Sequence, residues 1–187
     1  MLEQEYKIML TKEQYDSIES YFDFTDERIQ INHYYDSPNF DMIKNGFTVR
    51  VRELNGKRQI LQIKKSLDSK IDGVKVRNEF EKEIFALPKE ICLSSVENLI
   101  NEKCKIDFSK LENIGSLITK RKILKIQNCE ISLDKNDYLG KIDYELEIEF
   151  NGAHFKAFQI LKELGLENES TAMGKNKRFL KEKLKKH

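Results

Sequence analysis

The stretch 141–150 restricts the possible folds of this chain more than any other, because charged and apolar residues alternate in it one by one. Successive side chains of a β-strand point to opposite faces, so all the charge falls on one face. That face has four carboxylates in a row, namely Asp143, Glu145, Glu147 and Glu149. Such a row is unfavourable unless water screens it or cations bind it. Because Mg²⁺ and Mn²⁺ prefer carboxylate oxygens, the sequence favours bound divalent cations over a solvated strand face.

Strands with one charged and one apolar face are predicted in other segments too. At the start of the chain, Glu3, Glu5 and Lys7 share one face. Farther along, Arg50 and Arg52 share one face of a second predicted strand. Two neighbouring guanidinium groups can each bind phosphate oxygens in pairs, so they suit a polyanion. A solvated, arginine-rich strand face is the alternative interpretation.

A β-hairpin is predicted at Asn55 and Gly56, a dipeptide that favours a type I′ turn. The returning strand, expected over 58–65, then runs antiparallel to the arginine-bearing strand. If the arginines face inward, Lys64 joins them, and the three cations form one basic surface.

A further row of carboxylates, which includes Glu79 and Glu81, lies in a strand predicted over 75–85 after a loop over 68–73. Additional strands are predicted over 28–36, 116–127 and 129–134. Helices are predicted over 12–22, 41–44, 107–114 and 152–164. A further helix is predicted through 96–100, with Ser94 or Ser95 as its N-cap, and a last one near the C-terminus around Phe179. The turn at 138–140 separates the last two strands.

Composition narrows the classes of protein that the chain can belong to. The 187 residues suit a single domain, 1–187, and 33 basic against 32 acidic residues give a net charge of +1. This balance argues against a general nucleic-acid binder. No apolar run approaches the length of a membrane span, and no signal peptide is recognised. Three cysteines without a C-x-x-C pair indicate reduced, buried thiols in a cytoplasmic protein.

About eight amphipathic strands with covering helices predict an α+β protein, and two arrangements of the sheet satisfy the pattern. An open sheet would leave the charged face as ordinary surface. A closed antiparallel eight-stranded β-barrel, with the helices packed outside, would turn that face into a charged tunnel able to hold one small ligand. Composition and spacing do not choose between these arrangements.

An ordered set of motifs resembles the CYTH superfamily, also called triphosphate tunnel metalloenzymes. Glu3-Gln4-Glu5-Tyr6-Lys7 matches its E-x-E-x-K signature. The resemblance continues in order through Tyr34-Tyr35-Asp36-Ser37-Pro38, Gly46 to Arg52, Tyr144 to Glu149, and Lys175 to Phe179. It spans nearly the whole chain and is strongest to the small bacterial members often labelled adenylate cyclases.

The resemblance implies the closed barrel and a set of site residues. The phosphate-binding residues would be Lys7, Arg50, Arg52, Lys64, Arg121 and Lys175, with Lys177 or Arg178 as alternatives to Lys175. One or two Mg²⁺ or Mn²⁺ ions would be held by Glu3, Glu5, Asp134, Glu145 and Glu147. Glu79 and Glu81 would lie close by and position water.

The function implied is metal-dependent hydrolysis of inorganic triphosphate or a similar small-molecule triphosphate. The first alternative is an adenylate cyclase of the same fold, which would convert ATP to cyclic AMP. The second is a module that binds triphosphate or polyphosphate without turnover. The oligomeric state is left open.

Overall fold

A computed structural model describes residues 4–71, 74–152, 154–170 and 172–185, and the side chains among them other than those of 66–77. These residues form an antiparallel sheet of nine strands. Along the sheet the order is β1 (Gln4–Leu10), β9 (Lys141–Phe150), β8 (Cys129–Tyr138), β7 (Lys110–Ile126), β2 (Asp26–Asp36), β3 (Phe47–Leu54), β4 (Arg58–Ile71) and β5 (Val74–Ile84). The short β6 (Glu90–Cys92) pairs with β7.

The α+β class and the antiparallel pairing are confirmed. In the described part of the chain, however, the hydrogen-bonded path ends at β1 on one side and at β5 on the other. Closure into a barrel therefore stays a prediction.

Five helices lie in the described ranges: α1 (Lys12–Tyr21), α2 (Asp41–Lys44), α3 (Leu93–Ile100), α4 (Phe155–Glu163) and α5 (Lys175–Leu184). Thr11 caps α1 in a capping box with Gln14, as its sequence indicates. The expected serine cap of α3 is wrong, because the N-cap is Cys92 and its side chain makes no capping hydrogen bond.

Two further sequence predictions are wrong. The helix expected over 107–114 is largely strand, because the beginning of β7 pairs with β6 and buries Leu111. The periodicity of so short a stretch does not distinguish a helix from a strand. The loop expected over 68–73 is strand up to Ile71, the end of β4. Residues 72 and 73 lie outside the described residues.

The described residues divide into two compact units, whose boundaries fall within β2 and β7. Unit 1 comprises 30–117, and unit 2 comprises 4–29 and 118–185. Each unit has its own apolar core.

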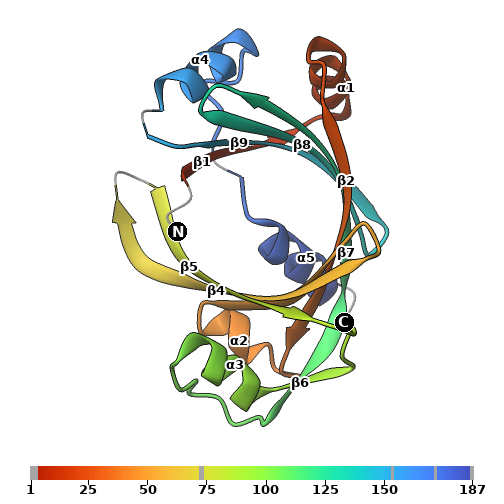
Figure 1. Cartoon of the computed structure of the whole chain (residues 1–187), viewed down its shortest axis with the longest axis vertical. Coiled ribbons are helices and arrows are strands. Elements are labelled where there is room, and N and C mark those ends of the chain that lie inside the picture. Colours follow the sequence, from red (N-terminus) through yellow and green to blue (C-terminus); the bar gives the residue numbers. More distant parts are fainter. Residues whose placement is uncertain (1–3, 72–73, 153, 171, 186–187) are drawn as a thin grey trace. The chain divides into compact units, whose positions relative to one another are not determined.

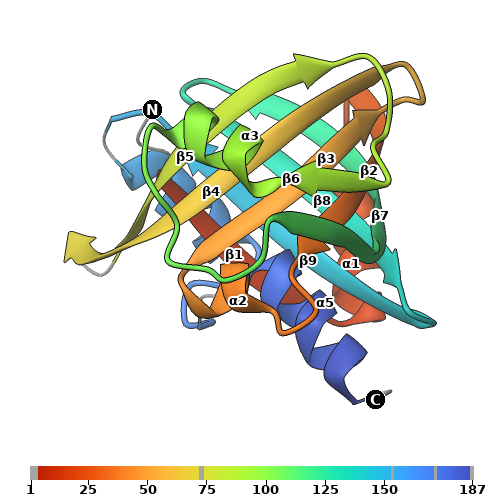
Figure 2. The same ribbon diagram turned by 90° about the horizontal axis from the view of Figure 1, so that it is seen from below.

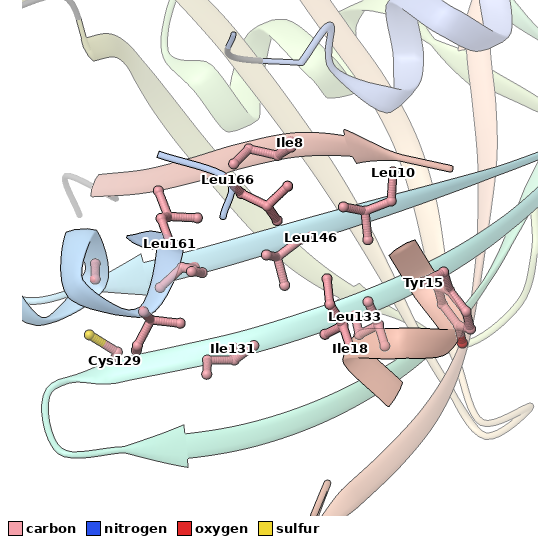
Figure 3. Packing of buried hydrophobic residues seen from close by; sticks show 13 residues of the cluster. Ile8, Leu10, Tyr15, Ile18, Cys129, Ile131, Leu133, Leu146, Leu161 and Leu166 are labelled. Atoms are coloured by element: carbon pink, nitrogen blue, oxygen red, sulfur yellow. The ribbon is translucent and has the colours of Figure 1, made fainter. Parts of the chain in front are cut away.

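In unit 2, the strands β1, β9 and β8 have helices on both faces (Figure 1). α1 and α4 lie on the apolar face, where Leu146 and Leu133 are almost fully buried (Figure 3). α5 lies on the opposite, charged face. The prediction that the helices pack outside, away from the charged face, is therefore wrong for α5, because lysine and arginine side chains on this helix pair with a carboxylate of β9.

In unit 1, α2 and α3 cover the strands β3, β4 and β5 (Figure 2). Val51, Ile63 and Met42 belong to the apolar core of this unit, and 0% of each residue is exposed to water. Met42 belongs to α2, which Asp36 fixes in place. The Asp36 carboxylate accepts hydrogen bonds from the backbone N–H groups of Ser37 and Met42, each at 2.8 Å, and of Ile43 at 3.2 Å.

We expect Asp36→Ala to lower the free energy of unfolding by about 2 kcal/mol, because it leaves buried N–H groups without an acceptor. Asp36→Asn keeps one carbonyl oxygen as an acceptor and should cost about half as much. Urea unfolding followed by circular dichroism would measure both. Equal stability of the alanine variant and the natural protein would contradict the capping role.

The cysteines are all unpaired, but only Cys129 is buried. Cys104 is half-buried and Cys92 is exposed, so the expectation of three buried thiols is wrong for Cys92. None of the helices in the described ranges combines the length and the apolar character that a membrane-spanning helix needs.

Candidate active site

The charged face of unit 2 is assembled by the register of four strands. Arg121 of β7 pairs with Asp134 of β8, and Asp134 pairs with Glu145 of β9. In the next row, Glu147 of β9 lies opposite Lys7 of β1. Cross-strand neighbours on one face have Cβ atoms about 5 Å apart, so this register brings the side chains into contact.

Three carboxylates converge at the centre of this face. Asp134, Glu145 and Glu147 each have a ligand oxygen within 4.8 Å of the others. We call these residues the buried trio, because at most 5% of any one residue is exposed. Hard oxygen ligands in this number and spacing suit a divalent cation. The sequence prediction that these three residues lie together is consistent with the structure.

The ammonium group of Lys175, the first residue of α5, lies at the centre of the buried trio. Its Nζ is 2.8 Å from Asp134 Oδ2, 2.9 Å from Glu145 Oε1 and 2.7 Å from Glu147 Oε1. A cation therefore already occupies the point where the oxygens converge. Because a positive charge binds there, the residues fit a divalent metal ion as well.

A second trio shares Glu147 with the first. Glu5, Glu147 and Glu149 also have ligand oxygens within 4.8 Å of one another, and Glu5 and Glu149 are half-buried. Lys7 Nζ lies 2.8 Å from Glu5 Oε1 and 3.1 Å from Glu147 Oε1. Glu3, predicted as a metal ligand, lies outside the described residues.

Burial and neighbouring charges shift the pKa values of the three carboxyl groups in different directions. Burial raises the pKa of Glu145 to about 7, and the adjacent Glu147 carboxylate adds to the shift. Burial would also raise the pKa of Glu147, but the charges of Arg121, Lys175 and Lys7 hold it well below its usual value. Burial likewise opposes ionisation of Asp134, but the charges of Arg121 and Lys175 lower its pKa. Glu147 and Asp134 are therefore the charged members of the trio at neutral pH, and Glu145 is the member that titrates near neutrality.

Arg121, which lies on β7, donates hydrogen bonds to two members of the buried trio. Its Nε and Nη2 donate to the two oxygens of Asp134, at 2.8 and 2.7 Å, and Nη2 also donates to Glu147. The Arg121 side chain is 13% exposed, and the Asp134 side chain is fully buried. Arg121 was predicted to bind phosphate; in this structure it neutralises carboxylates.

Arg178, one turn after Lys175 on α5, is part of the same network. It donates to both oxygens of Asp143, at 3.1 and 3.3 Å, and to Glu145. Tyr138 Oη also donates to Asp143, at 2.6 Å. Asp143 was not assigned to the site from the sequence, although it lies on the same strand face as Glu145. The i, i+3 spacing of Lys175 and Arg178 could have placed both side chains on one face of a helix, but it does not indicate that this face lies against β9.

In unit 1, the basic surface predicted on β3 and β4 is present. Arg50 is buried, with 7% of the residue exposed, and its Nε donates to Gln62 Oε1 at 2.8 Å. Gln62 in turn donates to Glu81, which is exposed. Among the described residues, Arg50 Nη2 has no hydrogen-bond partner although it is buried. Gln62 was missed from the sequence, but the hairpin register, which pairs it with Arg50, could have found it.

Lys64, Glu79 and Arg52, the other predicted residues of unit 1, also have polar partners. Lys64 pairs with Glu79, and Arg52 Nε donates to Asn32 Oδ1 at 3.4 Å. Burial opposes ionisation of Glu79, but the nearby charges of Lys64, Arg50 and Arg52 lower its pKa. Glu79 is thus a charged hydrogen-bond acceptor at neutral pH.

Comparisons with known proteins identify relatives of the chain. A family model described as the CYTH domain matches residues 1–174. The Bacillus subtilis (strain 168) protein named "Putative triphosphatase YjbK" is 32% identical over 199 residues, which cover 98% of this chain and 97% of that protein.

Two solved structures share the fold. A protein of Bacillus halodurans, described as a "putative adenylate cyclase", has a TM-score of 0.74 and 23% identity, over 95% of this chain and 97% of that one. HpAC1 from Hippeastrum, described as a "putative adenylyl cyclase" that reveals a dominant triphosphatase activity, has a TM-score of 0.72 and 19% identity, over 97% and 96% of the two chains. At these identities the likeness concerns the fold alone.

Proposed function

The chain belongs to the CYTH domain family, and from this premise we propose that it is a divalent-metal-dependent hydrolase of inorganic triphosphate or a similar triphosphate. The observation that carries the proposal is the buried trio, three converging carboxylates that already hold a positive charge. The name of the relative from Bacillus subtilis, "Putative triphosphatase YjbK", supports the same reaction.

The trio and the second carboxylate cluster are proposed to hold one or two Mg²⁺ or Mn²⁺ ions. The proposed ligands are Glu3, Glu5, Asp134, Glu145 and Glu147. When bound, such an ion supplies electrostatic stabilisation of the charge on the phosphate oxygens.

Phosphate binding is proposed for the basic residues of each unit, namely Lys7, Arg50, Arg52, Lys64, Arg121 and Lys175. The support is strongest for Arg50, because its buried Nη2 lacks a partner among the described residues. A buried N–H without an acceptor costs free energy, and a phosphate oxygen would satisfy it. Arginine also binds two oxygens of one phosphate group in a fixed geometry.

Glu79 and Glu81 are proposed to orient the attacking water. The lowered pKa of Glu79 keeps it ionised, so it can accept a hydrogen bond from water. The same shift makes it a weak base. We therefore assign it to positioning of the nucleophile and not to complete removal of the proton.

The closed eight-stranded barrel, a single functional domain over 1–187 and action in the cytoplasm are retained as parts of this proposal. The net charge of +1 favours a small-molecule triphosphate over nucleic acid as the partner. The unpaired cysteines favour a reducing compartment.

The proposal is tested by phosphate release from inorganic triphosphate, ATP and thiamine triphosphate, each with Mg²⁺ or Mn²⁺, with products separated by chromatography. We expect metal-dependent release of phosphate from inorganic triphosphate. Cyclic AMP as the main product from ATP would assign the chain to the cyclase reaction instead. Tight binding of triphosphate without turnover, across both metals and a wide pH range, would show a binding module.

A further inference from the structure

The ammonium group of Lys175 contacts all three carboxylates of the buried trio: it donates hydrogen bonds to Glu145 and Glu147 and forms an ion pair with Asp134. A lysine ammonium group has three N–H donors, and Nζ lies 2.7–2.9 Å from one oxygen of each of the three carboxylates. The lysine side chain is 12% exposed, and the three carboxylates are 0–7% exposed. Water therefore contributes little to solvating this ammonium group, and the trio replaces it.

The ammonium group and a divalent cation cannot occupy the trio together. Mg²⁺ needs oxygen ligands at about 2.0–2.1 Å, and the oxygens that would supply them are those that Lys175 contacts. An ion between these oxygens would also lie within a few ångströms of the ammonium charge, where repulsion is weakly screened because the groups are buried.

Resting on the divalent-cation part of the proposed function, we propose that metal binding displaces the Lys175 ammonium group from the buried trio and makes Lys175 available as a phosphate ligand. Lys175 is thus the internal cation of the metal-free protein, and a ligand for substrate only after metal has bound. Metal binding precedes productive binding of triphosphate.

The second turn of α5 allows this exchange without loss of the helix. Arg178 remains held by Asp143 and Glu145 and also donates to the carbonyl oxygen of Met173. Phe179 is fully buried next to Tyr138, with a ring-centroid distance of 6.4 Å. These contacts do not involve Lys175, whose flexible four-carbon side chain can move while the backbone stays docked.

The test is the affinity of the Lys175→Met variant for Mn²⁺ in the absence of substrate. Electron paramagnetic resonance measures the free Mn²⁺ and so gives the amount bound. If the ammonium group fills the trio for nine-tenths of the time or more, its removal tightens Mn²⁺ binding by at least about tenfold. Lys177→Met is the matched control, because Lys177 is an exposed residue of the same helix and its loss changes the net charge equally. It should leave Mn²⁺ affinity within about twofold.

A second measurement uses the natural protein. Mn²⁺ should increase the labelling of Lys175 by an amine-reactive reagent, relative to Lys177, as measured by mass spectrometry of peptides. If Lys175→Met binds Mn²⁺ no more tightly than Lys177→Met, or if labelling is unchanged by bound Mn²⁺, the competition is overturned while the proposed hydrolase stands. If Mn²⁺ binds to none of these proteins, the proposal fails together with the metal dependence of the hydrolase.

Discussion

Glu147→Gln should lower metal-dependent phosphate release from inorganic triphosphate by roughly 10³-fold. Glu147 is the residue shared by both carboxylate trios, and its pKa lies well below the usual value. Glutamine has nearly the same shape but no charge. The substitution therefore removes a metal ligand from both clusters and leaves Lys7 and Lys175 with one negative partner fewer.

Phosphate release at saturating Mn²⁺ would be measured together with Mn²⁺ affinity and circular dichroism, which separates a lost site from a lost fold. Glu163→Gln is the matched control, since Glu163 is an exposed residue of α4. Its activity should stay within about twofold of the natural protein. A folded Glu147→Gln variant that kept more than about a tenth of the activity would contradict the assignment of this residue.

Arg121→Met should lower the free energy of unfolding by about 3 kcal/mol, because it removes one partner of a buried ion pair. Asp134, which is fully buried, would lose both of its hydrogen bonds from the guanidinium group. Lys175 still contacts Asp134 at 2.8 Å, so the loss should lie at the low end of the range for buried pairs. Methionine fills much of the space of the arginine side chain, and the effect is therefore electrostatic rather than a cavity.

Urea unfolding would measure this difference, and an unchanged m value would show that the unfolded state is not altered. Lys125→Met is the control on the same strand. The Lys125 side chain is 74% exposed, and its Nζ lies 3.3 Å from Glu130 Oε2. Such exposed pairs contribute at most about 1 kcal/mol. If Arg121→Met and Lys125→Met lowered the free energy of unfolding equally, the buried Arg121–Asp134 pair would contribute no more to stability than the exposed Lys125–Glu130 pair.

Many strands of the sheet could be predicted from the local alternation of charged and apolar residues. The predictions that were wrong have physical causes. The alternation in 141–150 predicted β9 with its correct bounds. The Asn55–Gly56 turn predicted the β3–β4 pairing. In contrast, 107–114 was misread as a helix, because a short stretch with few apolar residues has no decisive period and its pairing with β6 is a contact between distant residues.

The sequence predicted which residues belong to the candidate site, but not which of their side chains contact one another. Asp134, Glu145 and Glu147 were placed on charged strand faces from the sequence, and the strand register brings them together. The sequence assigned Lys175 and Arg121 to phosphate, whereas the structure places both among carboxylates. Nothing in the local pattern could show this, because side-chain partners depend on which helix lies on which face.

By itself, the sequence determined that this chain forms amphipathic antiparallel strands with cations and carboxylates on one face, because strand geometry turns period-two alternation directly into faces. The ordered motifs also determined the family. Only the tertiary structure decided that α5 docks on the charged face and that Lys175 enters the buried trio. That choice depends on long-range charge pairing between a C-terminal helix and β9, which exists only once the strands are in register.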